Sequence, residues 1–129
     1  MKENRPQKPT ASELEILHVL WTRGPSTVRE VHQALGEKRS VGYTGVLKLL
    51  QIMTAKGTVR RNEDQRAHIY EACQPAEKTK SQLAVDVLQR VFDDSASQLM
   101  MHALAGRRGS KEEVEELRRL LDEYERKLR

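Results

Sequence analysis

At 129 residues the sequence suits one domain of ordinary size or two small subdomains. Its 37% hydrophobic and 4% aromatic residues are few for a large core, so we expect helices that complete their burial in an oligomer. No apolar run approaches the roughly 20 residues that cross a bilayer, and no signal peptide precedes the first expected helix. The single Cys73 excludes an internal disulfide and a multi-cysteine metal site. The simplest interpretation is a cytoplasmic protein with no direct membrane insertion.

Positive charge is concentrated in the first half of the chain. The net charge is +4; residues 1–72 carry 12 basic and 8 acidic side chains, whereas residues 73–129 carry 11 of each. Between Lys38 and Asn62 there are six basic residues and no acidic one. This asymmetry fits attraction to phosphate groups, although a difference of four charges decides nothing by itself.

Two short helices are expected to follow a mobile basic arm at residues 1–9. Each starts with the capping-box pattern T-x-x-E, in which the threonine and the glutamate side chains each bond the other residue's backbone N–H. The first helix is expected from Thr10 to about Arg23 and the second from Thr27 to Gly36. Two short helices before a third with basic flanks form a helix-turn-helix pattern.

The stretch from Ser40 to Gly57 is expected to be the central helix. Ser40 can cap its start, and Gly57 stands where a left-handed residue would end it. At 3.6 residues per turn, one arc of this helix is apolar and the opposite arc is mostly small and polar. The apolar arc consists of Tyr43, Val46, Leu47, Leu50 and Met53.

This central helix has the properties of a DNA recognition helix, with an ordinary amphipathic helix as the alternative. Thr44 and Lys48 are the best candidates for base contacts, and Gly45 allows the backbone to approach the DNA closely. Ile52 is interpreted as an exposed apolar residue rather than a contact to a thymine methyl group. The candidate DNA-binding residues in this region are Arg39, Ser40, Tyr43, Thr44, Gly45, Lys48 and Gln51.

Two runs rich in β-branched and aromatic residues follow, Thr58–Asn62 and Ala67–Ala72, joined by a polar segment. They predict a β-hairpin, which we expect to lean on the helices through Val59 and Ile69 because an isolated hairpin is marginal in water. Three helices followed by a hairpin is the winged-helix order. The candidate DNA-backbone contacts of this wing, each with a solvated surface residue as the alternative, are Arg60, Arg61, Arg66 and His68.

The chain is expected to divide at Gln74-Pro75. A winged-helix DNA-binding domain at residues 10–74 precedes a helical dimerisation domain at residues 75–129. The expected fold class is therefore mainly α, a winged helix-turn-helix of three helices and a hairpin followed by a helical dimerisation subdomain.

Three helices are expected in the second domain. A wide apolar stripe indicates a helix from Ala76 to Phe92, Ser95 can cap a short helix, and a flexible basic break at residues 106–109 precedes a last helix from Ser110. The last helix has the 3-4-3-4 apolar spacing of a coiled-coil seam, whose partner is a helix of this chain or, as we prefer, of a second copy. The candidate dimerisation residues are Leu83, Val87, Leu88, Val91, Val114, Leu117, Leu121, Tyr124 and Leu128.

No motif for catalysis, dinucleotide binding or phosphate-loop chemistry is present in the sequence. The four histidines are scattered, and the acidic residues at the start of the last helix fit a solvated face that complements the helix dipole. We therefore expect neither an enzyme nor a metal or cofactor site.

Four segments together resemble the BlaI/MecI penicillinase repressor family of bacterial transcription regulators. They read TASELEILHVLW, STVREVHQAL, YTGVLKLLQIMTAKGTVRR and DQRAHIYEA, and the closing SKEEVEELRRLLDEYE is similar to that family's last dimerisation helix. The resemblance covers about residues 10–125. It implies a winged-helix domain, a three-helix dimerisation domain and repression at a palindromic operator.

The resemblance also implies how repression ends. In the best-known members it controls β-lactam resistance and is relieved when a membrane zinc-protease receptor causes the repressor to be cut, at a position that falls here near His102-Ala103. The family's Asn-Phe at that site is not preserved. Gly45 and Ile52 also depart from the family's recognition-helix pattern, which leaves open the bases that are read. The cysteine cluster of copper-responsive relatives is absent, so copper sensing is not expected.

Three functional hypotheses remain at this point. The first is a homodimeric repressor released by proteolysis, the second a similar repressor released by a small-molecule ligand, and the third a winged helix used only for protein contacts. The basic run from Lys38 to Asn62 argues against the third, because a protein-only module has no need of it.

Overall fold

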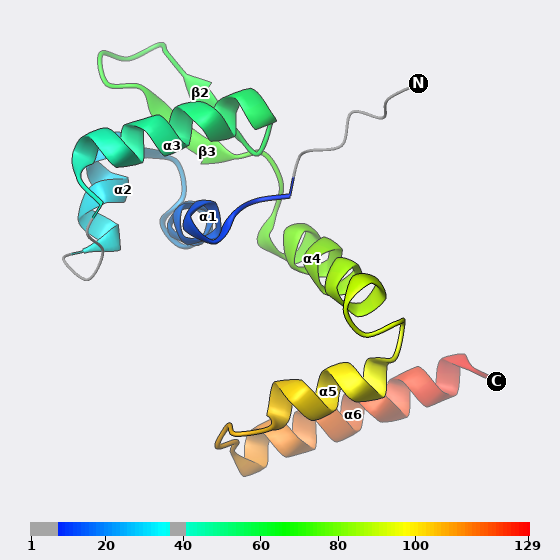
Figure 1. The fold of residues 1–129 in the computed structure, drawn as a ribbon. Helices are drawn as coiled ribbons and strands as arrows, with labels where there is room; N and C mark the ends of the chain where they lie inside the picture. The colour runs from blue at the N-terminus through cyan, green and yellow to red at the C-terminus, as the bar shows by residue number, and fades with distance from the viewer. Residues whose placement is uncertain (1–7, 37–40) are drawn as a thin grey trace, which may run out of the picture. The chain divides into compact units, whose positions relative to one another are not determined.

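The computed structural model describes residues 8–36 and 41–129 (Figure 1). These form two compact units, one ending at Ala84 and one running from Val85 to Arg129. The domain boundary expected at Gln74-Pro75 stays a prediction. The mainly helical winged-helix fold class is confirmed. In chain order the elements are α1 (Ala11–Arg23), β1 (Ser26–Thr27), α2 (Val28–Leu35), α3 (Tyr43–Lys56), β2 (Val59–Asn62), β3 (Ile69–Ala72), α4 (Ala76–Arg90), α5 (Ala96–Leu104) and α6 (Lys111–Lys127).

Both expected capping boxes are confirmed. Thr10 Oγ1 accepts the N–H of Glu13 at 3.2 Å, while the Glu13 carboxylate accepts the N–H of Thr10 at 3.4 Å. At α2 the reciprocal bonds between Thr27 and Glu30 measure 3.1 and 2.9 Å. The bond from the Thr27 N–H holds the pKa of Glu30 below its usual value, so this cap keeps its charge.

The start of α3 differs from the expectation. The helix begins at Tyr43 with Gly42 at its N-cap and no side-chain cap, so the cap expected from Ser40 is wrong. The reason is local, because Gly42 is extended (φ −77°, ψ 175°) and the chain enters the helix only after it. Ser40 itself and Arg39 lie outside the described residues. At the other end Gly57 is left-handed (φ 86°), as expected.

A hydrophobic core in the first unit joins α1, α2 and α3 to the sheet. Its members are almost fully buried, and side chains of this size each contribute about 1.5–3 kcal/mol when buried completely. They are Ile16, Leu17, Val19, Leu20, Val28, Val31, Val46, Leu50, Met53, Val59 and Tyr70.

The expected hairpin is present as β2 and β3, and β1 adds a third strand to give the order β1-β3-β2. Val59 pairs with Ala72, so it shares a face with Tyr70, two residues away along β3. Tyr70 is accordingly buried, whereas Ile69 is only half-buried, and the expectation that Ile69 anchors the hairpin is wrong. The indole of Trp21 in α1 also donates a hydrogen bond of 3.0 Å to the carbonyl of Gln74, which follows β3.

The second unit contains α5 and α6, which run in opposite directions (Figure 1). Ser95 and Ser110 cap them as expected. The turn between them is closed by Arg107, whose guanidinium makes two bonds of 3.2 Å to the carboxylate of Glu113. The preceding helix, α4, ends at Arg90, two residues short of Phe92. Within the described part of the chain, no helix has the length and apolar character to span a bilayer.

Candidate nucleic-acid interface

The outer face of α3 is open to solvent. Thr44, Lys48 and Gln51 are exposed side by side on it, and Ile52 is 40% exposed at its edge. The buried residues Val46, Leu50 and Met53 occupy the opposite arc and fix the helix on the core. No acidic residue occurs anywhere in α3, so a polyanion meets no fixed negative charge on this helix.

Gly45 has a packing role on this helix. A Cβ built on Gly45 would lie 2.8 Å from Cγ1 of Val41, which is closer than van der Waals contact allows. Gly45 is half-buried, and its lack of a side chain leaves room for Val41 to pack against α3. The expected close approach of the Gly45 backbone to DNA stays a prediction.

Tyr43 lies at the first turn of α3 and is 50% exposed. Its ring meets the ring of His32 edge-on, with centroids 6.4 Å apart and an interplanar angle of 83°. This contact joins α2 to the start of α3.

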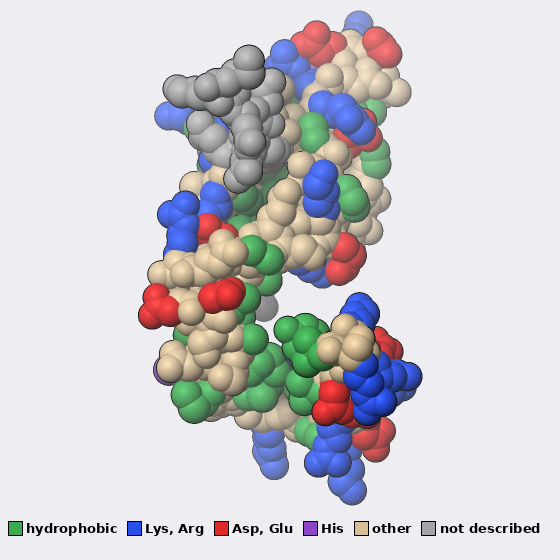
Figure 2. Space-filling view, turned by 90° about the vertical axis from the view of Figure 1, so that its right-hand side faces the viewer, with side chains coloured by type: hydrophobic (Ala, Val, Ile, Leu, Met, Phe, Trp, Pro, Cys, Tyr) green, Lys and Arg blue, Asp and Glu red, His purple; other side chains and the backbone are tan. Residues whose placement is uncertain are grey.

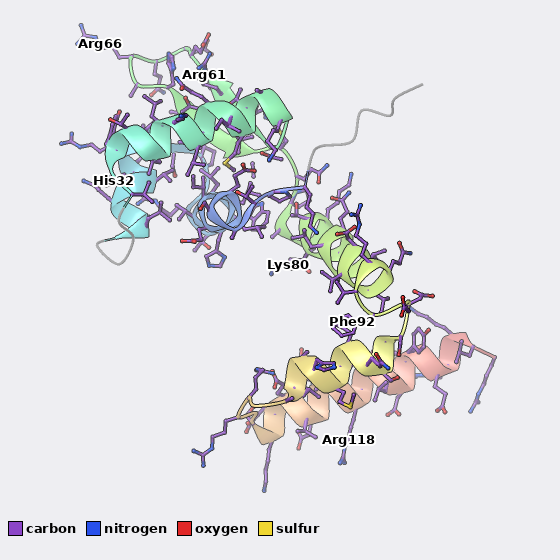
Figure 3. The ribbon with its side chains drawn as sticks, viewed as in Figure 1. His32, Arg61, Arg66, Lys80, Phe92 and Arg118 are labelled. Carbon is purple, nitrogen blue, oxygen red and sulfur yellow. The ribbon has the colours of Figure 1, made fainter. Side chains whose placement is uncertain are left out.

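The basic residues of the wing fall into two classes, and Figure 3 labels one residue of each, Arg61 and Arg66. Arg60 Nε lies 2.6 Å from the carboxylate of Glu71 on the neighbouring strand, and this bond raises the pKa of Arg60. Arg61 lies 2.6 Å from Glu63. By contrast, Arg66 is exposed and has no ion-pair partner among the residues that the structure describes. Among the described arginines of the wing, Arg66 is therefore the one most available to bind an anion.

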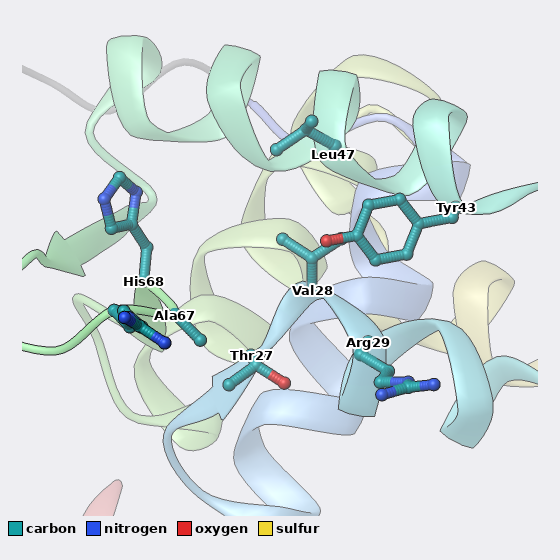
Figure 4. Close-up of a pocket in the computed structure, with 8 residues that line it drawn as sticks. Thr27, Val28, Arg29, Tyr43, Leu47, Ala67 and His68 are labelled. Atoms are coloured by element: carbon teal, nitrogen blue, oxygen red, sulfur yellow. The ribbon is translucent and has the colours of Figure 1, made fainter.

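A cavity of about 610 Å³ opens where α2, α3 and the wing meet. Figure 4 shows the Tyr43 ring extending from α3 toward Val28, with His68 and Ala67 at the side of the wing. We call this cavity the wing-root pocket. Its lining residues are Thr27, Val28, Arg29, Tyr43, Leu47, Arg66, Ala67 and His68.

Sequence reasoning missed Arg29 as a site residue. It is exposed in the first turn of α2, and the structure brings it to the same pocket as Arg66, which lies 37 positions later in the chain (66 − 29). The available signal was a basic residue just inside a capped helix that precedes α3. Of the other candidates, Tyr43, Arg66 and His68 share the pocket, whereas Arg60 and Arg61 do not line it.

The residues expected to mediate dimerisation fall into a half-buried group and an exposed group. Leu83, Val87, Leu88 and Leu117 are half-buried within the single chain. In contrast, hydrophobic side chains reach the surface of the α5–α6 unit at the bottom of the view in Figure 2. The exposed candidates are Val91 (66%), Val114 (45%), Leu121 (66%), Tyr124 (66%) and Leu128 (72%).

His102 and Ala103, near the expected cleavage position, lie in α5 and are both exposed. The His102 ring packs on Phe92, with centroids 5.6 Å apart. In the part of the chain that the structure describes, no three His, Cys, Asp or Glu side chains gather as metal ligands would.

A winged helix whose central helix presents an exposed lysine and no acidic residue is typical of a DNA-binding transcriptional regulator. The chain belongs to the penicillinase repressor family, whose model matches residues 9–123. The resemblance noted in the sequence is thereby confirmed, and the protein is a winged-helix transcriptional repressor and no enzyme.

Relatives support this assignment. The chain is 35% identical over 114 residues to the transcriptional regulator BlaI of Mycobacterium tuberculosis, in strains CDC 1551 / Oshkosh and ATCC 25618 / H37Rv, covering 88% of this chain and 82% of that protein. The solution structure of monomeric Bacillus licheniformis BlaI in complex with the blaP half-operator matches with a TM-score of 0.50. That match covers 57% of this chain and 89% of the other at 18% identity, and it shows the same fold.

Proposed function

We propose that this chain is a homodimeric repressor that binds a palindromic operator by placing α3 in the major groove of each half-site. The observation that carries the proposal is the outer face of α3, where Thr44, Lys48 and Gln51 are exposed on a helix without acidic residues. An α-helix fits the major groove, where lysine and glutamine can bond base edges. The Bacillus licheniformis BlaI structure contains a half-operator, which supports the same use here.

The surrounding candidates are assigned to the DNA backbone. Basic and hydroxyl side chains beside a recognition helix position the protein on phosphates without choosing sequence. Arg39 and Ser40, which precede α3 in the chain, remain candidates for this role. The described candidates are Tyr43, Arg60, Arg61, Arg66 and His68.

Dimerisation is assigned to the second part of the chain. Val114, Leu121, Tyr124 and Leu128 lie on one seam of α6, and each is at least 45% exposed in the single chain. A second copy would cover this seam and hold two recognition helices in register with a two-fold operator. The half-buried stripe of α4, including Leu83, Val87 and Leu88, is the second candidate surface.

The proposal is tested by measuring binding to the DNA upstream of the chain's own gene and to a scrambled duplex of equal composition. Specific binders prefer their site by a factor of roughly 10³–10⁷ over other sequences. We expect preference for the upstream duplex within that range at fixed salt. Equal affinity for both duplexes would contradict the proposal.

We further propose that repression of β-lactam resistance or related genes ends by proteolysis at the exposed His102-Ala103 segment, prompted by a membrane metalloprotease receptor. Cutting there would separate α6 and its seam from the DNA-binding unit. Losing the link between two half-site contacts can lower affinity by roughly 10²–10⁴. Mass spectrometry of the repressor from antibiotic-treated cells should show a cut in α5. An intact chain beside derepressed genes would favour the alternative, release by a small-molecule ligand.

A further inference from the structure

The wing-root pocket combines cationic and apolar groups from three elements that are separate in the sequence. Arg29 comes from α2, Tyr43 and Leu47 from α3, and Arg66 and His68 from the wing. None of its eight lining residues is acidic. The pocket therefore favours an anion on electrostatic grounds, and its volume of about 610 Å³ lies within the range of ordinary ligand sites.

An anion in this pocket would be bound by side chains rather than by the backbone N–H groups at the N-terminus of α2. The first turn of that helix is already capped by the reciprocal bonds of Thr27 and Glu30. Glu30 also lies 3.1 Å from Arg23, so its charge is engaged away from Arg29. Neither Arg29 nor Arg66 has an ion-pair partner among the described residues, and both guanidinium groups stay available for an incoming anion.

The position of the pocket selects the kind of anion. If α3 lies in a major groove, as proposed above, and the wing reaches toward the next minor groove, the sugar–phosphate strand that separates the two grooves would pass between helix and wing. The wing-root pocket, which has α3 on one side and residues 66–68 on the other, would then face that strand. The apolar surfaces of Val28 and Leu47 suit the deoxyribose rings that flank a phosphate.

We propose that the wing-root pocket binds one backbone phosphate in each half-site, held jointly by Arg29 and Arg66. This inference rests on the proposed DNA-binding function and adds to it a defined site with one residue, Arg29, that the sequence did not indicate. Guanidinium groups form strong charge-assisted bonds with phosphate oxygens. A phosphate held from two elements sets the register of α3 in the groove without reading a base.

The test replaces each phosphate of the upstream duplex in turn by a neutral methylphosphonate and measures binding by the full-length protein. Wild type should show one position per half-site where neutralisation weakens binding roughly tenfold or more, the scale of a charge-assisted hydrogen bond. In the double variant Arg29→Ala/Arg66→Ala that position should lose its sensitivity, while other sensitive positions keep theirs. Arg29→Lys/Arg66→Lys, which keeps both charges, should retain part of it.

Salt dependence gives a second readout. If both arginines bind one phosphate, the double variant should reduce the magnitude of the slope of log affinity against log salt by about 0.9 per half-site. If they bind separate phosphates, the reduction should be about twice as large. Arg118→Ala, which removes an exposed charge from α6, is the matched control and should leave the methylphosphonate map unchanged. Unchanged thermal unfolding of the double variant is expected because both side chains are exposed.

The outcomes separate the two proposals. If wild type binds the upstream duplex and the double variant keeps the same sensitive position, the pocket proposal is overturned and the repressor proposal stands. If wild type shows no preference for that duplex, both fall. A third arm adds inorganic phosphate at constant ionic strength and follows the arginine side-chain NMR signals. Saturable shifts of Arg29 and Arg66 together with an unchanged DNA map would assign the pocket to a free anion and overturn the DNA assignment.

Discussion

Lys56, at the end of α3, holds its ammonium group 2.8 and 3.2 Å from the two carboxylate oxygens of Glu13, in the first turn of α1. The two side chains are only 15% and 4% exposed. The same carboxylate accepts the N–H of Thr10. One largely buried ion pair therefore joins the start of α1 to the end of α3.

Removing one partner of this pair should destabilise the fold. Lys56→Met leaves the Glu13 carboxylate without a cation, and breaking a buried pair in this way costs on the order of 3 kcal/mol. Urea unfolding followed by the fluorescence of Trp21, the single tryptophan, measures the loss. Glu13→Gln/Lys56→Met should recover most of it because no buried charge is left alone. The exposed control Lys48→Met should change stability by less than about 0.5 kcal/mol, and an equally small change for Lys56→Met would contradict this account.

The fold was predictable from the sequence where its determinants are local. The two capping boxes and the left-handed Gly57 act over a few residues, and all three are confirmed. The two-residue strand β1 carries no periodic signal, and only its pairing with β3 reveals it. Strand register explains the wrong choice of Ile69 over Tyr70, because a shift of one residue exchanges the two faces of a strand.

Only part of the candidate site could be predicted, because some of its contacts join residues that are far apart in the sequence. Thr44 and Lys48 follow from the period of one helix, and both are exposed as that period requires. The ion pairs of Arg60 and Arg61 depend on tertiary neighbours, as does the meeting of Arg29 with Arg66 in one pocket. Patterns along the chain do not encode such distant neighbours.

Lys48→Ala tests base reading by α3. If the ammonium of Lys48 bonds a base edge, its loss should weaken binding to the upstream duplex by roughly 1–3 kcal/mol and change binding to a scrambled duplex much less. Titrations of both duplexes at one salt concentration measure the difference. An equal loss on the two would demote Lys48 to a phosphate contact.

Glu71→Gln tests whether the cross-strand ion pair keeps Arg60 from binding a DNA phosphate. The Glu71 carboxylate occupies Arg60 at 2.6 Å and competes with any phosphate for that guanidinium. Neutralising it should tighten binding to scrambled DNA and steepen the salt dependence by up to about one unit. Glu77→Gln in α4 is the control for a simple change in net charge. Equal effects of the two substitutions would show that Arg60 is not a DNA contact.

The seam of α6 offers a matched pair of variants. Leu121→Ala/Tyr124→Ala truncates two seam residues that are each 66% exposed in the single chain, so the protomer should stay folded while the dimer dissociates. Leu120 is 55% exposed and lies off the seam, so Leu120→Ala should leave the dimer intact. Sedimentation velocity measures both. A monomer from Leu120→Ala beside an unchanged seam variant would move the interface to another face of the helix.

Hydroxyl-radical footprinting of the full-length protein on its upstream DNA tests the central claim, a two-fold repressor with one α3 in each of two major grooves. The account predicts two protected segments of related, inverted sequence whose centres lie about one helical turn, or a multiple of it, apart. The seam variant Leu121→Ala/Tyr124→Ala should protect both segments only at much higher concentration. A single protected segment, or uniform protection without sequence preference, would contradict it.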